Sequence, residues 1–237
     1  MTKLISKAFG RAQDLEAFDT GLSVSASHQL VYIAAGTLTL EVGDFRWCLP
    51  PQCAAWITAG VEYTALVERS VSLRTIYFTT DHSGPDVRCS VFSISPLGRE
   101  MILHAMRWPQ GNTDPLAEHF FHTLSGLCCE WSRDALEFRL HQPRSEELRS
   151  AMSYALEHLA EEPRLENAAR QAGVSPRTLS RRFADEAKTS WRQYLHTARM
   201  IRAVELLSVP GARVTDTAVS VGFDSLGAFS QAFRHFT

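Results

Sequence analysis

The spacing of apolar positions divides the chain into a β-rich first part and a helical remainder. Polar and apolar residues alternate with a period of two in Thr37–Val42, and Ser72–Phe78 is a second alternating run. Turn-forming pairs such as Gly43-Asp44 and Pro50-Pro51 separate these runs at short intervals. We therefore expect residues 22–80 to form the short strands of a small sandwich or barrel.

Helical periodicity starts close to Pro96. Residues 97–108 and 115–131 are predicted helices. A third helix is predicted to begin near Ser145, because acidic residues in its first turn interact favourably with the helix dipole. The apolar stripe of this third helix comprises Leu148, Met152, Ala155, Leu156 and Leu159. The first two predicted helices have apolar faces with little chain left to cover them. This pattern favours a homodimer that forms through residues 96–132.

Two segments near the C-terminus share one pattern, AARQAGVSPRTLSRRF at 168–183 and TAVSVGFDSLGAFSQAF at 217–233. Each has a small-residue helical stretch, then a Gly, an apolar residue and a Ser, and then a second helical stretch that ends in Phe. The glycines of the two segments lie 49 residues apart. The pattern predicts two helix-turn-helix units, joined by one long helix over 191–207.

The first unit has a strongly basic outer side. Gly173 can adopt the left-handed conformation that ends a helix, and Ser175 can cap the helix predicted for 176–186. Leu179 and Phe183 are expected to face inward. The outward positions, which we assign to DNA binding, are Arg177, Thr178, Ser180, Arg181 and Arg182. Arginine can bind guanine through two hydrogen bonds or clamp a phosphate.

The second unit repeats this arrangement with fewer charges. Its second helix, over 226–236, is expected to face the core with Ala228, Phe229, Ala232 and Phe233. Its outward positions are Gly227, Ser230, Gln231 and Arg234. Glutamine can read adenine, whereas Arg234 suits a phosphate. A rigid connecting helix would place the two recognition helices in adjacent major grooves, about 34 Å apart.

These segments carry a resemblance to the AraC/XylS family of bacterial transcription regulators. GVSPRTLSRRF, WRQYLHTARMIRAVELL and VTDTAVSVGFDSLGAFSQAFR resemble the family's DNA-binding domain, and residues 28–63 resemble its cupin-like sensor domain. The resemblance implies an α+β chain with a cupin-like barrel at 1–95, a helical dimerisation segment at 96–142 and a double helix-turn-helix domain at 143–237. It also implies that bases are read at Arg177, Ser180 and Arg181, and at Gly227, Ser230 and Gln231.

The resemblance extends to the partners and the location of the protein. It implies a cytoplasmic transcription regulator, commonly an activator, that binds double-stranded DNA, with RNA polymerase as a further partner. Three positions depart from the family pattern. Lys188 stands where the family usually has Gly, so a left-handed turn would cost about 1 kcal/mol and a locally different turn is expected. Thr217 replaces an aliphatic residue, and Gly227 lowers helix propensity by about 1 kcal/mol. The chain also stops at Thr237, before the family's usual final segment.

Charge is distributed unevenly between the two parts of the chain. Residues 163–237 carry 11 Lys and Arg against 6 Asp and Glu, although the whole chain has a net charge of −2. A basic C-terminal third is typical of a protein in which one domain meets phosphates. An odd number of cysteines, five, and no export signal in residues 1–18 favour reduced thiols in the cytosol. No apolar run is long enough for a membrane span.

The predicted barrel lacks the metal ligands of cupin enzymes. No H-x-H motif follows His28, and Tyr63 stands where a metal-binding His would be. We therefore expect no metal and no other cofactor, and a barrel that binds a small organic effector. The candidate effector-binding residues are His28, Tyr32, Trp47, Trp56, Tyr63 and Arg74.

Two other functions stay open. One is a regulator with a vestigial barrel that needs no effector, and the other is a cupin-type metalloenzyme with an accessory helical domain. Glu118, His119 and His122 share a predicted helix, but paired His at i, i+3 is not the usual zinc spacing, so a polar stripe is the preferred interpretation.

Overall fold

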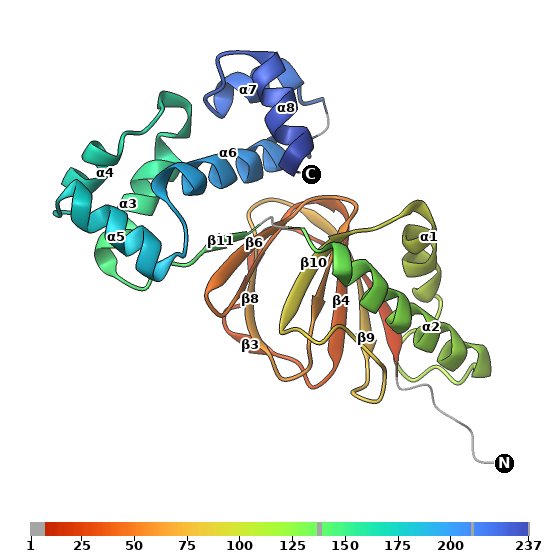
Figure 1. Cartoon of the computed structure of the whole chain (residues 1–237). Helices are drawn as coiled ribbons and strands as arrows, with labels where there is room; N and C mark the ends of the chain where they lie inside the picture. Colours follow the sequence, from red (N-terminus) through yellow and green to blue (C-terminus); the bar gives the residue numbers. More distant parts are fainter. Residues whose placement is uncertain (1–7, 137–138, 210, 237) are drawn as a thin grey trace. The chain divides into compact units, whose positions relative to one another are not determined.

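The computed structural model describes residues 8–136, 139–209 and 211–236, and these form two compact units (Figure 1). The first unit contains the chain up to Gly43 and from Trp47 to residue 136. The second contains Asp44–Arg46 and the chain from Arg139 onward. The first seven residues of the segment searched for an export signal, and Thr237 at the end of the chain, lie outside the described residues.

The first unit consists of two antiparallel sheets. Its strands are β1 (Phe9–Leu15), β2 (Phe18–Asp19), β3 (Ser23–Val24), β4 (His28–Gly36), β5 (Leu38–Val42), β6 (Phe45–Leu49), β7 (Cys53–Ile57), β8 (Glu62–Val67), β9 (Val71–Phe78) and β10 (Cys89–Ser93). One sheet has the order β1-β9-β4-β7-β10. The other runs β6-β5-β8-β2, and β3 also pairs with β8. The predicted β-structure ahead of the helices is confirmed, but β1, β2 and β10 lie outside the range 22–80.

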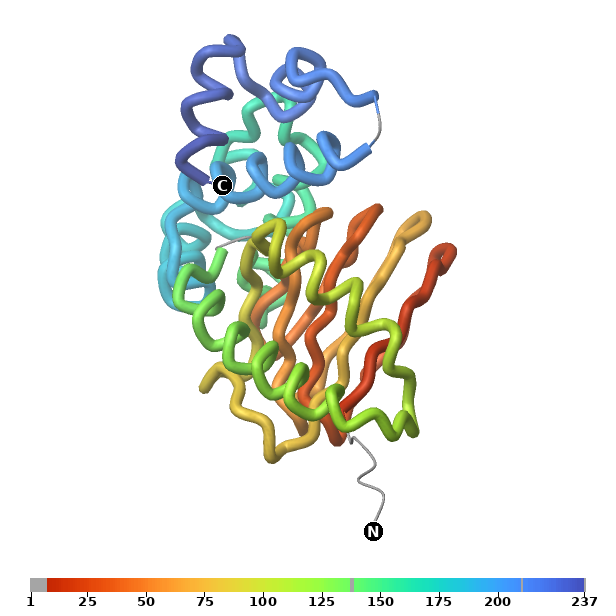
Figure 2. Tube along the Cα trace, turned by 90° about the vertical axis from the view of Figure 1, so that its right-hand side faces the viewer, coloured from red at the N-terminus to blue at the C-terminus, as the bar shows by residue number. Residues whose placement is uncertain are grey.

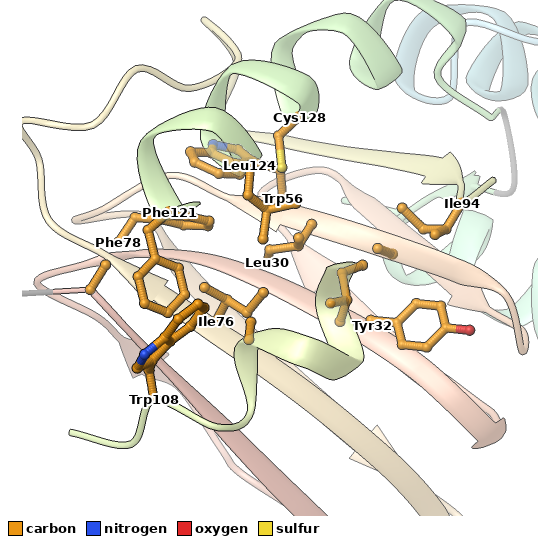
Figure 3. Packing of buried hydrophobic residues seen from close by; sticks show 14 of the residues in the cluster. Leu30, Tyr32, Trp56, Ile76, Phe78, Ile94, Trp108, Phe121, Leu124 and Cys128 are labelled. Atoms are coloured by element: carbon orange, nitrogen blue, oxygen red, sulfur yellow. The ribbon is translucent and has the colours of Figure 1, made fainter. Parts of the chain in front are cut away.

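Two helices cover one face of the β1-β9-β4-β7-β10 sheet. These are α1 (Pro96–Ala105) and α2 (Pro115–Trp131), which cross the strands in Figure 2. Phe121, Leu124 and Cys128 of α2 are fully buried, and they point onto sheet residues that include Leu30 and Trp56 (Figure 3). Burial of a side chain such as Phe121 contributes roughly 1.5–3 kcal/mol.

The expectation that the apolar faces of the first two helices lack cover, which favoured a dimer, is wrong. The apolar faces of α1 and α2 are covered by the sheet of their own chain. Strands β4 and β7 have runs of consecutive buried residues, which give the sheet an apolar outer face as well as an apolar inner one. The predicted helix over 97–108 ends at Ala105. Trp108 instead donates its Nε1 hydrogen to Asp114 Oδ2 at 2.8 Å, at the start of α2.

The second unit is helical. Its elements are β11 (Arg139–His141), α3 (Glu146–Glu157), the 3-10 turn η2 (Leu159–Glu161), α4 (Leu165–Gln171), α5 (Pro176–Glu186), α6 (Trp191–Leu207), α7 (Val214–Ser220) and α8 (Leu226–Phe236). A further 3-10 turn, η1 (Ser132–Asp134), follows α2 in the first unit. The helices predicted for 176–186, 191–207 and 226–236 have these bounds in the structure.

Two predicted inward positions are wrong. Leu156 of α3 is 41% exposed, whereas Ala151, five residues earlier in the helix, is fully buried. The stripe of α3 therefore follows Leu148, Ala151, Met152 and Ala155. Ala228 is exposed in the first turn of α8, where the helix has not yet reached the core that Phe229 enters.

The helical unit has two separate hydrophobic cores that share α6. The first joins α3, α4 and α5 to Tyr194 near the start of α6. The second joins α7 and α8 to Met200 and Ala203 in the later part of α6. Each helix-turn-helix pair, α4–α5 and α7–α8, therefore belongs to its own core.

None of the helices in the described ranges is long and apolar enough to cross a membrane. All five cysteines lie in the described part of the chain and are present as thiols. Burial raises the pKa of Cys53 to about 11, so this thiol is protonated and unreactive at neutral pH.

Candidate nucleic-acid interface

Helix α5 is held by local signals that are visible in the sequence. Gly173 ends α4 with a φ of +68°, and Ser175 Oγ accepts the Thr178 N–H at 3.1 Å. Leu179 and Phe183 are fully buried in the first core. The opposite face of α5 therefore points to solvent.

That face carries three of the predicted DNA-binding residues. Arg177, Ser180 and Arg181 are all exposed on α5. Two guanidinium groups and a hydroxyl on one helix face can contact base edges in a major groove and phosphates beside it. The exposed face of α5 thus has the chemistry of a recognition helix.

Thr178 and Arg182 have other partners. Thr178 is half-buried, and its Oγ1 lies 2.9 Å from the capping Ser175 Oγ. Arg182 is 31% exposed; its Nη1 donates to Glu186 Oε1 at 3.1 Å and its Nη2 to Glu147 Oε1 at 2.9 Å. The prediction that Arg182 points outward to DNA is wrong for this structure, because two carboxylates draw its guanidinium back against α3.

Glu186 completes the contact between α5 and α3. Its carboxylate accepts the backbone N–H of Ser145 at 2.9 Å and the Ser145 hydroxyl at 2.8 Å. Burial opposes ionisation of Glu186, but the hydrogen bonds from Ser145 and Arg182 outweigh it and lower the pKa of the carboxyl. The C-terminal end of the recognition helix is therefore fixed to the cap of α3.

The turn after α5 keeps the left-handed geometry. Lys188 has a φ of +50°, and the N–H of Thr189 donates to Phe183 O at 3.2 Å, as at a helix C-terminus. The expectation of a locally different turn is wrong. Lys188 instead adopts the conformation that glycine would adopt more easily.

Helix α8 repeats the arrangement with a less charged face. Ser225 Oγ accepts the Ala228 N–H at 3.2 Å, and Phe229 is buried in the second core with Phe233 stacked on it at 5.4 Å. Gly227, Gln231 and Arg234 are exposed, and Ser230 is half-buried. Arg234 Nε donates to Ser230 O, so part of its guanidinium is held on its own helix.

Four of the predicted effector residues lie on the sheet face that the helices cover or at its edge. Tyr32 is 1% exposed and packs in the cluster that includes Ile102 of α1. His28 stacks on Trp56 at 5.2 Å, and Arg74 pairs with Asp14 across the β1–β9 edge at 3.2 Å. These four candidates for effector binding therefore do not lie on the sheet face opposite the helices. Their positions along β4, β7 and β9 share the face of the buried Leu30 and Ile76, since alternate residues point to opposite faces.

The inner face, defined here as the face opposite α1 and α2, carries a polar group that the sequence analysis missed. Gln29 of β4 is 5% exposed, lies opposite Tyr77 of β9 in register, and forms a hydrogen bond with the predicted Tyr63 of β8. Burial raises the pKa of Tyr63. Trp47, also predicted, is 4% exposed. Strand parity, applied to Gln29 and Tyr77, is the signal that could have found them.

Glu118 and His122 of α2 lie near His82, a histidine that the sequence pattern did not single out. His82, only 6% exposed, has its Nε2 at 3.9 Å from Glu118 Oε1, and its ring centroid lies 6.2 Å from that of His122. Among the described residues, no three His, Cys, Asp or Glu side chains are arranged to hold a metal ion. Burial lowers the pKa of His82 despite the opposing charge of Glu118.

The chain is similar to known helix-turn-helix proteins. Residues 168–237 match the family model of a helix-turn-helix domain. The chain is 28% identical over 209 residues to the HTH-type transcriptional regulator NimR of Escherichia coli K12, covering 87% of this chain and 75% of NimR. It is 36% identical over 87 residues to the HTH-type transcriptional activator RhaS of Salmonella schwarzengrund, covering 37% of this chain and 31% of RhaS. A fatty-acid-bound crystal structure of ToxT from Vibrio cholerae aligns with 97% of this chain and 91% of ToxT, at 9% identity and a TM-score of 0.42.

The paired helix-turn-helix units, the domain match over residues 168–237 and the similarity to NimR indicate a DNA-binding transcription regulator. The chain is similar to AraC-type helix-turn-helix regulators, and it has an antiparallel β unit ahead of its helix-turn-helix units.

Proposed function

We propose that the chain reads a bipartite DNA site with α5 in one major groove and α8 in the next. The observation that carries this proposal is the exposed set Arg177, Ser180 and Arg181, on the side of α5 opposite its buried Leu179 and Phe183. In the second unit, Gln231 reads a base, Gly227 and Ser230 lie close to the groove, and Arg234 contacts a phosphate. Thr178 and Arg182 shape α5 and do not reach bases.

Arginine chemistry sets the preferred partner. Bidentate contact of Arg177 or Arg181 with guanine O6 and N7 would give the first half of the site a G·C preference. Gln231 suits adenine, so the second half favours an A·T pair at one position. DNA selected from a random pool by the purified full chain tests both statements. Enrichment of unrelated sequences, or the same sequences after Arg181→Ala, would contradict them.

The β unit is proposed to be a sensor of a small organic effector. We divide the protein into the sensor at residues 1–95, a helical segment at 96–142 and the DNA-binding domain at 143–237. The polar group of Gln29, Tyr63 and Tyr77 on the inner face supports this role, since ligand sites combine apolar walls with a few placed polar groups. The alternative is a vestigial barrel that controls DNA binding without an effector.

Melting curves separate the two possibilities. An effector at about 100 times its dissociation constant would stabilise the protein by about 2.7 kcal/mol, which shifts the melting temperature visibly. The matched variant Tyr63→Phe removes the hydroxyl that pairs with Gln29 and should reduce the shift. If no compound in a broad metabolite panel moves the curve of the full chain, the effector-independent function is favoured.

We also propose that the protein is a cytoplasmic homodimer associated through residues 96–132. Leu97 of α1 and Leu116 of α2 support this surface, because they stay 69% and 57% exposed while their neighbours pack on the sheet. RNA polymerase is the proposed second protein partner if the regulator activates transcription. Sedimentation of the full chain and of Leu116→Glu tests the dimer, which is contradicted by a monomer at tens of micromolar.

A further inference from the structure

The α7–α8 unit meets the segment that precedes α4 at one backbone carbonyl, that of Leu159. Arg199, in the middle of α6, donates from Nη2 to the carbonyl oxygen of Leu159 at 3.2 Å. Leu159 is the first residue of η2, the 3-10 turn between α3 and α4. Gly222, in the turn between α7 and α8, approaches the same carbonyl so closely that an added Cβ would lie 2.5 Å from that oxygen.

Gly222 therefore has a packing role that Gly173, its counterpart in the α4–α5 pair, does not have. Both glycines are left-handed, with a φ of +68° at Gly173 and +79° at Gly222. A Cβ added at Gly173 would meet no atom of the described chain within 4 Å. At Gly222 it would also lie 2.9 Å from Arg199 Nη2. The missing side chain at Gly222 lets the α7–α8 turn rest on η2 and on Arg199.

The guanidinium of Arg199 is enclosed at this junction. Its Nε is buried and has no hydrogen-bond partner among the described residues, so the group is held by its bond to Leu159 and by packing. Arg202, one turn further along α6, is a useful contrast. Arg202 is exposed, and its charge is paired with Glu205 on the same helix at 2.8 Å.

The position of this junction matters because the recognition helices belong to different cores. Helix α5 packs in the first core and α8 in the second, and α6 runs from one to the other (Figure 1). Each core packs on its own part of α6, so this one helix sets their relative orientation but can still bend or twist slightly. A second point of attachment, away from the axis of α6, restrains that bending and twisting.

We propose that Arg199 is a positioning residue that sets which spacing of DNA half-sites the protein accepts. This inference rests on the proposed reading of two adjacent major grooves by α5 and α8. Each base pair inserted between half-sites rotates one groove relative to the other by about 35° and moves it along the axis, because B-DNA has about 10–10.5 base pairs per turn. A rigid Arg199 junction therefore accepts one spacing, and a loosened junction accepts several.

The test measures binding of the full chain to a bipartite site whose spacer is changed by −1, +1 or +2 base pairs. For the wild type we expect each change to weaken binding roughly tenfold, equivalent to about 1.4 kcal/mol. For Arg199→Met, which keeps the apolar stem and removes the donors, we expect the best site to bind more weakly and all spacers to bind within about threefold of one another. Binding to each isolated half-site should be unchanged.

Matched variants separate positioning from simple loss of structure. Arg202→Met on the same helix should keep the wild-type spacing preference. Gly173→Ala and Gly222→Ala both place a side chain at a left-handed position, yet only Gly222→Ala should flatten the preference. If Arg199→Met does not fold, Arg199→Lys, which can still donate one hydrogen bond, and Gly222→Ala decide the question through the same spacing series.

Two outcomes overturn different statements. A folded Arg199→Met variant with the wild-type spacing preference contradicts the positioning role of Arg199 and leaves the proposed function intact. A wild type that binds the bipartite site no better than one half-site contradicts the proposed reading by two helices, and the positioning role falls with it.

Discussion

Arg182 of the first recognition helix lies 2.9 Å from Glu147 of α3, measured from Nη2 to Oε1. This contact, with the second ion pair to Glu186, sets the end of α5 against the helix that precedes the DNA-binding pair. Its neighbour Arg181 is exposed. Two consecutive arginines in one helix therefore differ in their surroundings, because Arg182 holds the helix and Arg181 is exposed for the DNA contact that we propose.

This difference can be measured with two single substitutions. Arg182→Met should lower the free energy of unfolding by about 1 kcal/mol, since the partly buried ion pairs are lost, while leaving the selected DNA sequence unchanged. Arg181→Ala should leave stability unchanged, cost about 1–3 kcal/mol on the specific site and relax one base preference. Denaturant unfolding and DNA selection on both variants check this. The reverse pattern, with Arg182→Met altering base preference, would show that Arg182 reaches DNA.

Lys188→Gly should stabilise the protein. Lys188 sits at a φ of +50°, where a side chain costs about 1 kcal/mol relative to glycine, so the melting temperature should rise by roughly 2–4 °C. Lys188→Ala is the control, because alanine keeps the strained Cβ and should bring no such gain. A decrease in stability for Lys188→Gly would mean that the lysine side chain makes a compensating interaction.

Stability should fall as the pH drops below the ordinary His pKa of 6.5, and His82 should contribute to that fall. Because burial lowers the pKa of His82 in the folded state, the unfolded state binds the proton more readily. The stabilising effect of a neutral His82 is therefore complete above pH 6.5 and is lost progressively as the pH falls from there towards its folded-state pKa. The groups that face His82 are Glu118 and His122 of α2, Asp81 and Thr79 of its own loop, and His28 of β4.

Thermal melts of His82→Gln between pH 7.5 and pH 5 test this contribution. The variant should show a flatter decline than the wild type. His119→Gln, on the exposed side of the same helix α2, is the control and should follow the wild-type curve. Identical slopes for the His82 variant and the wild type would assign the acid sensitivity to other groups.

The half of the DNA site read by α5 should contribute more specificity than the half read by α8. Helix α5 exposes two arginines, whereas α8 exposes Gly227 and Gln231 beside a half-buried Ser230. Each mismatched base pair typically costs about 1–3 kcal/mol, so scrambling the α5 half removes more of the affinity. Competition binding with each half scrambled measures the two losses. Equal losses would contradict the unequal roles of the two helices.

The helix-turn-helix units could be predicted from the sequence because their signals are local. Gly173 and Ser175 determine the end of one helix and the cap of the next within three residues, and Gly222 and Ser225 do so within four. The contact of Arg182 with Glu147 could not be predicted in this way. The two residues are 35 positions apart, and only the packing of α5 on α3 brings them together.

The β unit shows the corresponding limit for a ligand site. Alternation correctly indicated strands, but both faces of the β1-β9-β4-β7-β10 sheet are buried, one by the other sheet and one by α1 and α2. Aromatic residues such as Tyr32 and Trp56 therefore fit either face, and both turned out to pack under the helices. Which face a strand residue takes depends on distant elements, so strand parity separates Gln29 from Leu30 but does not tell which of them lies on the inner face.

Hydroxyl-radical footprinting of the full chain on its selected DNA tests the central claim most directly. Two recognition helices that lie in adjacent major grooves predict two protected segments on one face of the duplex, with centres about one helical turn apart. Arg181→Ala should weaken protection of one segment, and Gln231→Ala should weaken the other. A single protected segment, unchanged by Gln231→Ala, would contradict reading by two helices.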